Sequence, residues 1–82
     1  MGYQLMLPDI TQSTLKIVVD DSTLFRGLWR VAIKERETMN IGLRMKDGSE
    51  MIVILNPSAI ATMALAPTED ETNADLKIAR IT

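Results

Sequence analysis

The most regular hydrophobic pattern in the chain lies between residues 39 and 55. Apolar side chains occupy every second position from Met39 to Met45, which is typical of a strand with one buried face. The next residues, Lys46 to Ser49, contain an Asp-Gly pair, which readily adopts the positive φ that hairpin turns require. Residues 51–55 are continuously apolar, as in a short buried strand. The pattern therefore predicts a β-hairpin over this region.

Weaker strand signals flank this hairpin on both sides. Residues 14–19 alternate in the manner of a strand, and Leu76 and Ile78 indicate a closing strand. The segment 3–12 is a short lead-in broken by Pro8, and residues 68–73 form a polar loop. The chain therefore contains several short strands joined by turns.

The segment Asn56-Pro57-Ser58 breaks the second half of the hairpin and has two interpretations. Asn56 is a good helix N-cap, and Pro57 would then occupy the first helical turn. The same residues also suit a tight loop into a strand, Ala59 to Leu65, which Pro67 would end.

Residues 23–37 fit two periodicities, with a slight preference for the helical one. As a helix, residues 24–34 place their apolar side chains on one broad arc and Arg26, Arg30 and Lys34 on the other. As a strand, the aromatic positions Phe25 and Trp29 share a face. A glycine at position 27 costs a helix interior about 1 kcal/mol, whereas in a strand it marks a bulge or bend. An α+β domain with a helix at 22–37 is one outcome.

The composition excludes several classes of function. The 82 residues form a single domain, 1–82, and contain neither Cys nor His, which removes disulfides, thiolate zinc sites and the commonest general base. No Gly-rich phosphate loop and no Ser-base arrangement is present, so we expect no enzyme, no catalytic residue, no metal and no cofactor. A domain this small is only marginally stable alone, and 46% hydrophobic residues favour self-association.

The sequence shows no signal-peptide pattern and no segment near the ~20 apolar residues that a membrane span requires. We therefore expect a cytoplasmic protein without a membrane partner. The net charge is −2, which argues against a general DNA-coating protein. Six of the nine basic residues nevertheless fall within 21 positions and predict a local phosphate-binding patch, or otherwise a solvated face: Arg26, Arg30, Lys34, Arg36, Arg44 and Lys46.

The order of these elements resembles the Sm-like family. The run from Lys16 to Trp29, with a strand, a turn and then Gly27, is similar to the start of the first Sm motif, and Met39-Asn40-Ile41-Gly42-Leu43 stands where that motif continues. The run Ile52-Val53-Ile54-Leu55, the break at Asn56-Pro57 and the segment 59–63 are similar to the second motif. The resemblance covers residues 14–66.

The resemblance implies a mainly β fold, a small, strongly bent five-stranded antiparallel barrel of the Sm-like or SH3-like type. Residues 23–34 would then be a long bent second strand, with Gly27 at the bend. The core would be 14–66, and 67–82 would be an acidic loop with an extra C-terminal strand or tail. The implied partners are further copies in a cyclic homo-oligomer, a ring, and RNA or single-stranded DNA.

The resemblance also implies two sets of site residues. The nucleic-acid site would lie in the loops before Met39 and around Asn56, and would comprise Lys34, Arg36, Thr38, Met39, Asn40 and Asn56. The oligomer interface would use the open edges of the last two strands, and would comprise Met51, Val53, Leu55, Ile60 and Thr62.

A second hypothesis is a structural or adaptor β module that self-assembles through open sheet edges and binds only protein. The acidic pI of about 4.9 favours it. So does Thr38, which stands where the family often has a base-stacking aromatic residue.

Overall fold

The computed structural model describes the backbone of residues 2–7, 16–60 and 62–81, and the side chains of these ranges up to residue 76. The elements follow one another as β1 (Gly2–Met6), β2 (Val18–Val19), α1 (Ser22–Glu35), β3 (Met39–Arg44), β4 (Glu50–Leu55), the 3-10 helix η1 (Pro57–Ala59), β5 (Ala64–Thr68) and β6 (Ala74–Ile81).

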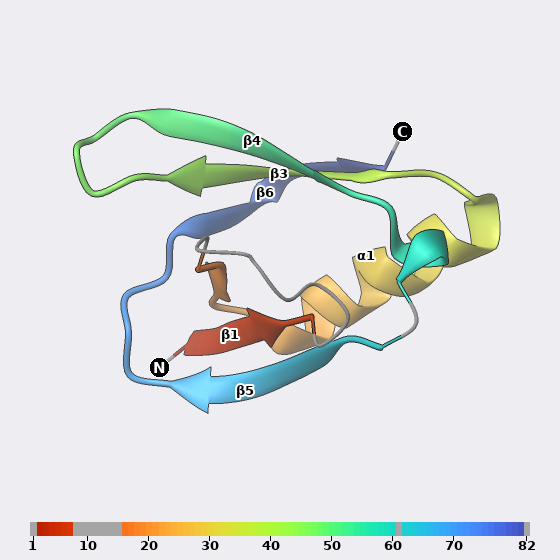
Figure 1. Ribbon diagram of the computed structural model, residues 1–82, viewed down its shortest axis with the longest axis horizontal. Coiled ribbons are helices and arrows are strands. Elements are labelled where there is room, and N and C mark those ends of the chain that lie inside the picture. The colour runs from red at the N-terminus through yellow and green to blue at the C-terminus, as the bar shows by residue number, and fades with distance from the viewer. Residues whose placement is uncertain (1, 8–15, 61, 82) are drawn as a thin grey trace.

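The described strands form two antiparallel sheets of three strands each. One has the order β2-β1-β5 and the other the order β4-β3-β6. Figure 1 shows the second sheet above the pair β1–β5, with α1 lying between the two layers toward one end. The buried core draws on both sheets and the helix, with Leu5 and Val19 from the first sheet, Ile41 and Leu43 from the second, and Phe25 from α1.

Local chemistry explains why residues 22–35 are helical. The side chain of Asp21 accepts a hydrogen bond from the backbone N–H of Leu24 at 2.9 Å, which is an N-cap. At the other end, Arg36 adopts a left-handed conformation (φ 55°), and the N–H of Glu37 donates to the carbonyl of Ala32. An N-cap contributes about 1 kcal/mol, which offsets the similar cost of Gly27.

The prediction of a long bent strand over residues 23–34 is therefore wrong. The helix buries Phe25, Trp29 and Ala32 on one face and leaves Val31 and Ile33 exposed, whereas a strand would group Val31 and Ile33 with Phe25 and Trp29. In the described residues the fold is mainly β, as predicted, but it consists of two sheets with one α-helix and one short 3-10 helix and is not a closed five-stranded barrel.

Other sequence predictions have mixed outcomes. The 39–55 hairpin is confirmed, with Gly48 at φ 89° in its turn, and so is the closing strand near the C-terminus. Asn56 precedes a short helix with Pro57 in its first turn, which decides between the two interpretations of that segment. The predicted strand 59–65 is wrong, because the strand runs from 64 to 68 and contains Pro67.

The segments near both ends of the chain form strands that contribute residues to the core, to a greater extent than the sequence indicated. The lead-in forms β1 over residues 2–6, between β2 and β5. Of the strand predicted at 14–19, residues 16–19 are described, and among these Val18 and Val19 are strand; residues 8–15 lie outside the described part. Strand β6 pairs with β3, and its Leu76 is buried in the core. The segment 67–82 is therefore not an appendage to a core at 14–66.

Candidate interaction surface

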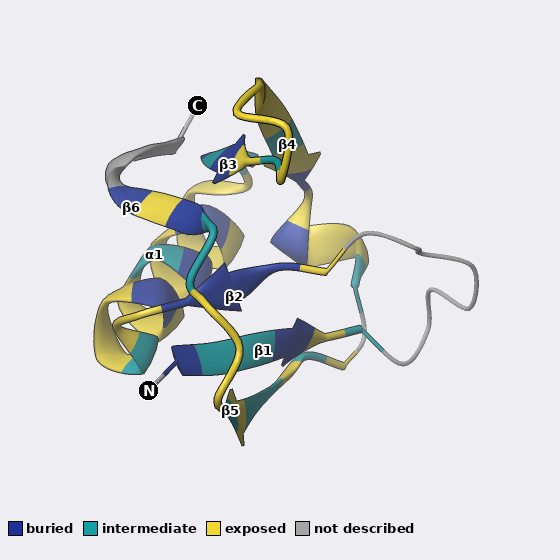
Figure 2. Cartoon of the chain, turned by 90° about the vertical axis from the view of Figure 1, so that its left-hand side faces the viewer, coloured by how far each residue is buried: buried dark blue, intermediate teal, exposed yellow. Residues whose placement is uncertain are grey.

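Strand β4 lies at the edge of its sheet and carries the two most exposed large apolar side chains of the described residues. Ile52 is 70% exposed and Ile54 is 66% exposed, although isoleucine is among the residues most often buried. Met51 is also exposed. Figure 2 shows β4 as the outermost strand of its sheet, with much of its length in the colour of exposed residues.

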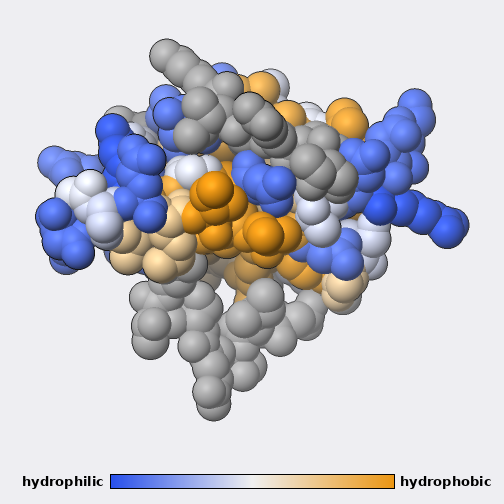
Figure 3. Space-filling model, turned by 90° about the horizontal axis from the view of Figure 1, so that it is seen from above, coloured by the Kyte–Doolittle hydropathy of each residue, from blue (hydrophilic) through white to orange (hydrophobic). Residues whose placement is uncertain are grey.

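The side chains of β4 alternate between the core and the solvent. Leu55 is buried and Val53 is half-buried, so the odd-numbered residues face inward, whereas Glu50, Ile52 and Ile54 face outward. Figure 3 views this outer face from above and shows apolar residues grouped in its middle, with hydrophilic residues on both sides. The outer face of β4 is thus an apolar strip that the described chain leaves uncovered.

The backbone of β4 adds unpaired groups to this apolar strip. The N–H of Met45 donates to the carbonyl of Ser49 at 2.8 Å, and hydrogen-bonded and non-hydrogen-bonded pairs alternate along an antiparallel ladder. The odd-numbered residues of β4 therefore bond to β3, and the even-numbered residues point their N–H and C=O groups to the open edge. Glu50, Ile52 and Ile54 hence offer both backbone groups and outward side chains.

The hairpin turn fixes this register. The carboxylate of Asp47 accepts hydrogen bonds from the backbone N–H of Ser49 at 2.8 Å and from its hydroxyl at 2.6 Å. These bonds lower the pKa of Asp47, the hydroxyl bond contributing most. A one-residue slip would turn Ile52 and Ile54 into the core and Val53 and Leu55 out, so the turn decides which face is apolar.

The other end strands of the two sheets are occupied or blocked. The side-chain Oδ1 of Asn73 accepts from the N–H of Val18 at 2.8 Å, and the N–H of Asn73 donates to the carbonyl of Val18, so the edge of β2 is covered. β5 contains Pro67, which has no N–H and is tolerated in strands where that position faces the open edge. β6 packs against α1 and β2. Among the described strands, β4 therefore offers the best edge for pairing.

The predicted interface residues coincide only partly with this surface. Met51, Val53 and Leu55 lie on β4, but on its inner face. Ile60 and Thr62 follow η1 and precede β5, so they lie on no strand. Ile52 and Ile54 were not among the predicted interface residues, although Glu50, two residues before Ile52, signals that the even-numbered positions face water.

The predicted nucleic-acid residues lie at one end of the molecule, and all but one of them are at least partly exposed to solvent. Lys34 and Arg36 are exposed at the end of α1. Met39 pairs with Leu55, so Thr38 and Asn56 are the next residues of the chain beyond that pair, and half-buried Asn40 follows on β3. Met39 itself is completely buried in the core, which leaves it no surface for a ligand.

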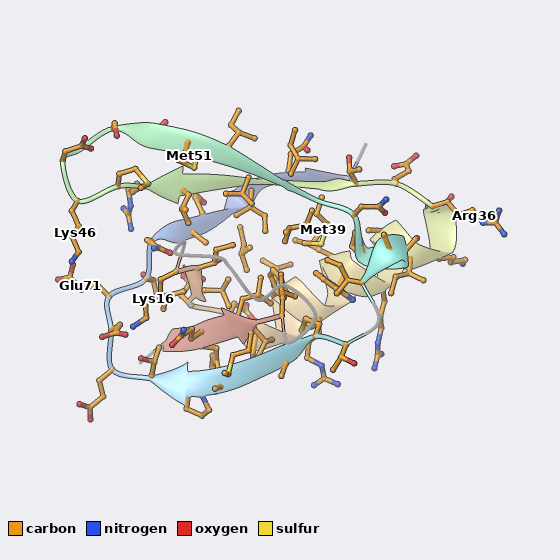
Figure 4. All side chains as sticks on the ribbon, in the orientation of Figure 1. Lys16, Arg36, Met39, Lys46, Met51 and Glu71 are labelled. Carbon is orange, nitrogen blue, oxygen red and sulfur yellow. The ribbon has the colours of Figure 1, made fainter. Side chains whose placement is uncertain are left out.

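The basic cluster of the sequence is divided between two ends of the fold. Figure 4 shows Arg36 projecting at one end and Lys46 at the hairpin on the opposite end. Near the hairpin, a pocket of about 490 Å³ is lined by Lys16, Leu43, Arg44, Met45, Lys46, Asp47 and Asn73. The predicted single patch over residues 26–46 is therefore wrong.

Acidic and carbonyl groups engage the basic residues of the hairpin end. Lys16 forms an ion pair with Asp70, and Arg44 donates to the carbonyl of Thr72 at 3.1 Å. The bond from Lys16 and then that from Thr68 lower the pKa of Asp70, with a smaller effect of the Lys16 charge. Arg26, Arg30 and Lys34 by contrast form an exposed stripe along α1.

Three comparisons with known proteins identified no relative of this chain. A scan against protein-family models, a search of curated proteins and a search of solved structures gave no match to this chain. Within the described residues, no helix combines the length and apolar character needed to cross a membrane.

Proposed function

We propose that the protein is a structural, non-enzymatic module that assembles with other copies of itself through the open edge of β4. The observation that carries this proposal is the coincidence, on one strand, of edge-facing backbone groups and the exposed side chains of Ile52 and Ile54. An added strand would satisfy the backbone groups and cover the apolar side chains in the same step.

The proposal has a physical basis in what soluble chains usually avoid. Natural sheets guard their edges with Lys, Pro, bulges or a covering segment, because an exposed apolar edge promotes pairing with other chains. β5 carries Pro67 and β2 is covered by Asn73, so this fold guards two of its edges. β4 has neither Lys nor Pro among its six residues. We take this difference as support for a pairing function of β4.

The test is the molar mass of the protein in solution over a range of concentrations, measured by light scattering after size exclusion. We expect association of the wild-type chain at tens to hundreds of micromolar and its loss in Ile52→Lys. Ile33→Lys is the matched control, because Ile33 is also an exposed isoleucine (45%) but lies on α1. A wild-type chain that stays monomeric throughout, or equal loss in both variants, would refute assembly through β4.

A second candidate function, binding of RNA or single-stranded DNA, has one observation in its favour. Arg26, Arg30 and Lys34 follow one another at single-turn intervals on the exposed side of α1, where they can contact successive phosphates. The test is the fluorescence anisotropy of labelled U-rich and A-rich oligonucleotides at low salt. Binding that is lost in Arg30→Glu would support this function, and no binding at tens of micromolar protein would remove it.

A further inference from the structure

Resting on the proposed assembly, we infer its geometry: β4 pairs with β4 of a second copy, antiparallel, about a two-fold axis at Val53. This arrangement joins the two β4-β3-β6 sheets into one six-stranded sheet. It differs from the ring expected from the sequence, in which β4 would pair with a different strand of each neighbour. The inference follows from the direction in which each residue of β4 points.

The backbone permits only certain registers. A two-fold axis perpendicular to the sheet keeps the outer faces of both copies on the same side, so outward residues oppose outward residues. The edge-facing backbone groups belong to Glu50, Ile52 and Ile54, and these must also oppose one another to form hydrogen bonds. Both conditions are met when the axis passes through any residue of β4, and the centres that lie at or between the two exposed isoleucines are Ile52, Val53 and Ile54.

The side chains select the centre at Val53. In this register Ile52 opposes Ile54 of the second copy, and Ile54 opposes its Ile52, so both exposed isoleucines form apolar cross-strand pairs. On the inner face, Val53 opposes Val53 and Met51 opposes Leu55. No charged side chains oppose each other, because Glu50 lies opposite Asn56 of the second copy.

The neighbouring registers leave apolar and polar residues mismatched. A centre at Ile52 places Glu50 opposite Ile54, and a centre at Ile54 places Ile52 opposite Asn56. Only the centre at Val53 therefore covers all four isoleucines with apolar partners.

The edges of the fold also favour a closed pair over a head-to-tail ring. A ring needs a second open edge of different sequence on each copy. β5 lacks one donor at Pro67, and the edge of β2 is bonded to Asn73. A two-fold pair joins the β4 edges of both copies and leaves no further edge of this kind among the described strands, so assembly stops at the dimer.

The size of the contact predicts a weak dimer. One strand edge with its flanking side chains falls below the roughly 1,200 Å² of a standard specific interface. We therefore expect a dissociation constant in the micromolar range. Because the dimer is weak, a covalent bond between the two copies is the best way to detect the register.

The experiment scans the register with single cysteines, since the chain contains none of its own. The variants are Val53→Cys, Ile52→Cys and Ile54→Cys, with Thr23→Cys on exposed α1 as the background control. Residues at the centre of the inferred register form a non-hydrogen-bonded pair with Cα atoms about 4.5 Å apart, which is within disulfide range. Each variant is oxidised at equal concentration, and the disulfide-linked dimer is quantified by non-reducing electrophoresis.

The inferred register predicts that Val53→Cys forms disulfide-linked dimer at least about tenfold faster than Thr23→Cys, with Ile52→Cys and Ile54→Cys well below it. An equimolar mixture of Ile52→Cys and Ile54→Cys should give more heterodimer than either gives homodimer, which keeps the test valid if Val53→Cys folds poorly. Fastest linkage of Ile52→Cys or Ile54→Cys, or rates equal to background in every variant and in the mixture, overturns the register.

The two experiments distinguish failure of the two-fold register from failure of the proposed assembly through β4. Concentration-dependent association that Ile52→Lys abolishes, without enriched linkage at Val53, leaves assembly through β4 standing and removes the two-fold register. A chain that is monomeric at every concentration removes both.

Discussion

Asn73 is bonded to Val18 by two hydrogen bonds that join the two sheets across 55 positions of sequence. The N–H of Val18 donates to Oδ1 of Asn73 at 2.8 Å, and the backbone N–H of Asn73 donates to the carbonyl of Val18 at 3.0 Å. Nδ2 of Asn73 also donates to the carbonyl of Lys16 at 2.7 Å, and the N–H of Arg44 donates to the carbonyl of Asn73. One residue thus bonds β2 on one side and β3 on the other.

Removal of the Asn73 side chain should destabilise the fold strongly. Asn73→Ala leaves the N–H of fully buried Val18 and the carbonyl of Lys16 without these partners, and an unsatisfied buried polar group costs about 1–3 kcal/mol. We expect a loss of about 2–3 kcal/mol in the free energy of unfolding. The measurement is urea denaturation followed by the fluorescence of Trp29, the single tryptophan, which is buried.

The matched control for this prediction is Asn56→Ala. Asn56 is exposed and its side chain makes no capping hydrogen bond to η1, so we expect a change within about 0.5 kcal/mol. Equal effects of the two substitutions would show that the bonds of Asn73 do not hold the sheets together.

Substitution of Gly27 by alanine should stabilise the protein. Gly27 lies inside α1, and a Cβ atom there meets nothing within 4 Å, so alanine gains helix propensity without a clash. We expect an increase of about 1 kcal/mol in the free energy of unfolding. Loss of stability would instead indicate that the glycine serves a bend, as the strand interpretation requires.

Gly2→Ala is the opposite case and calibrates the assay. A Cβ atom at Gly2 would lie 2.8 Å from Cγ1 of Val18, which is closer than atoms pack, so neighbouring backbone or side chains must shift. We expect a loss of about 1–3 kcal/mol from this overpacking.

The sequence predicts local elements well and non-local ones poorly. The hairpin was predictable because Asp47-Gly48 and the alternation around it act within a few residues. The helix was not, because residues 24–34 satisfy both periodicities and the decision comes from the Asp21 cap and from packing on two sheets. The bonds of Asn73 follow no sequence pattern, so it appeared only as part of a polar loop.

The candidate surface was predictable in place but not in detail. The open edge of the last hairpin strand was expected from its apolar run without Lys or Pro. The interface residues expected on this strand, Met51, Val53 and Leu55, lie on its inner face, and the exposed Ile52 and Ile54 were not named, because a continuous apolar run does not reveal which face is buried. The pairing with β3 settles this, since the odd-numbered positions of β4 lie on the same side as Ile41 and Leu43.

Arg36→Gly should stabilise the end of α1. Among the described residues Arg36 is the non-glycine residue with positive φ (55°), and left-handed backbone costs an L-residue about 1–2 kcal/mol, whereas glycine adopts it freely. Because glycine also gains entropy in the unfolded chain, we expect a net gain of about 0.5–1 kcal/mol. Thermal denaturation followed by circular dichroism measures it, and Lys34→Gly, inside the helix, should lose stability.

Acid should remove the contribution of Asp70 to stability, and salt should distinguish it from that of Asp47. Both carboxyl pKa values are lowered in the folded chain, that of Asp70 first by the bond from Lys16 and that of Asp47 first by the bond from the Ser49 hydroxyl. A lowered pKa means that each contribution is present above the unfolded pKa, near 3.8, and is lost as the pH falls through the folded value. The stability difference between wild type and Asp70→Ala should therefore shrink below about pH 4, and the same holds for Asp47→Ala.

At pH 7, 1 M NaCl should reduce the Asp70→Ala difference, because the ion pair is exposed, and should leave the Asp47→Ala difference largely unchanged. Differences that persist at pH 2, or that respond equally to salt, would contradict these assignments.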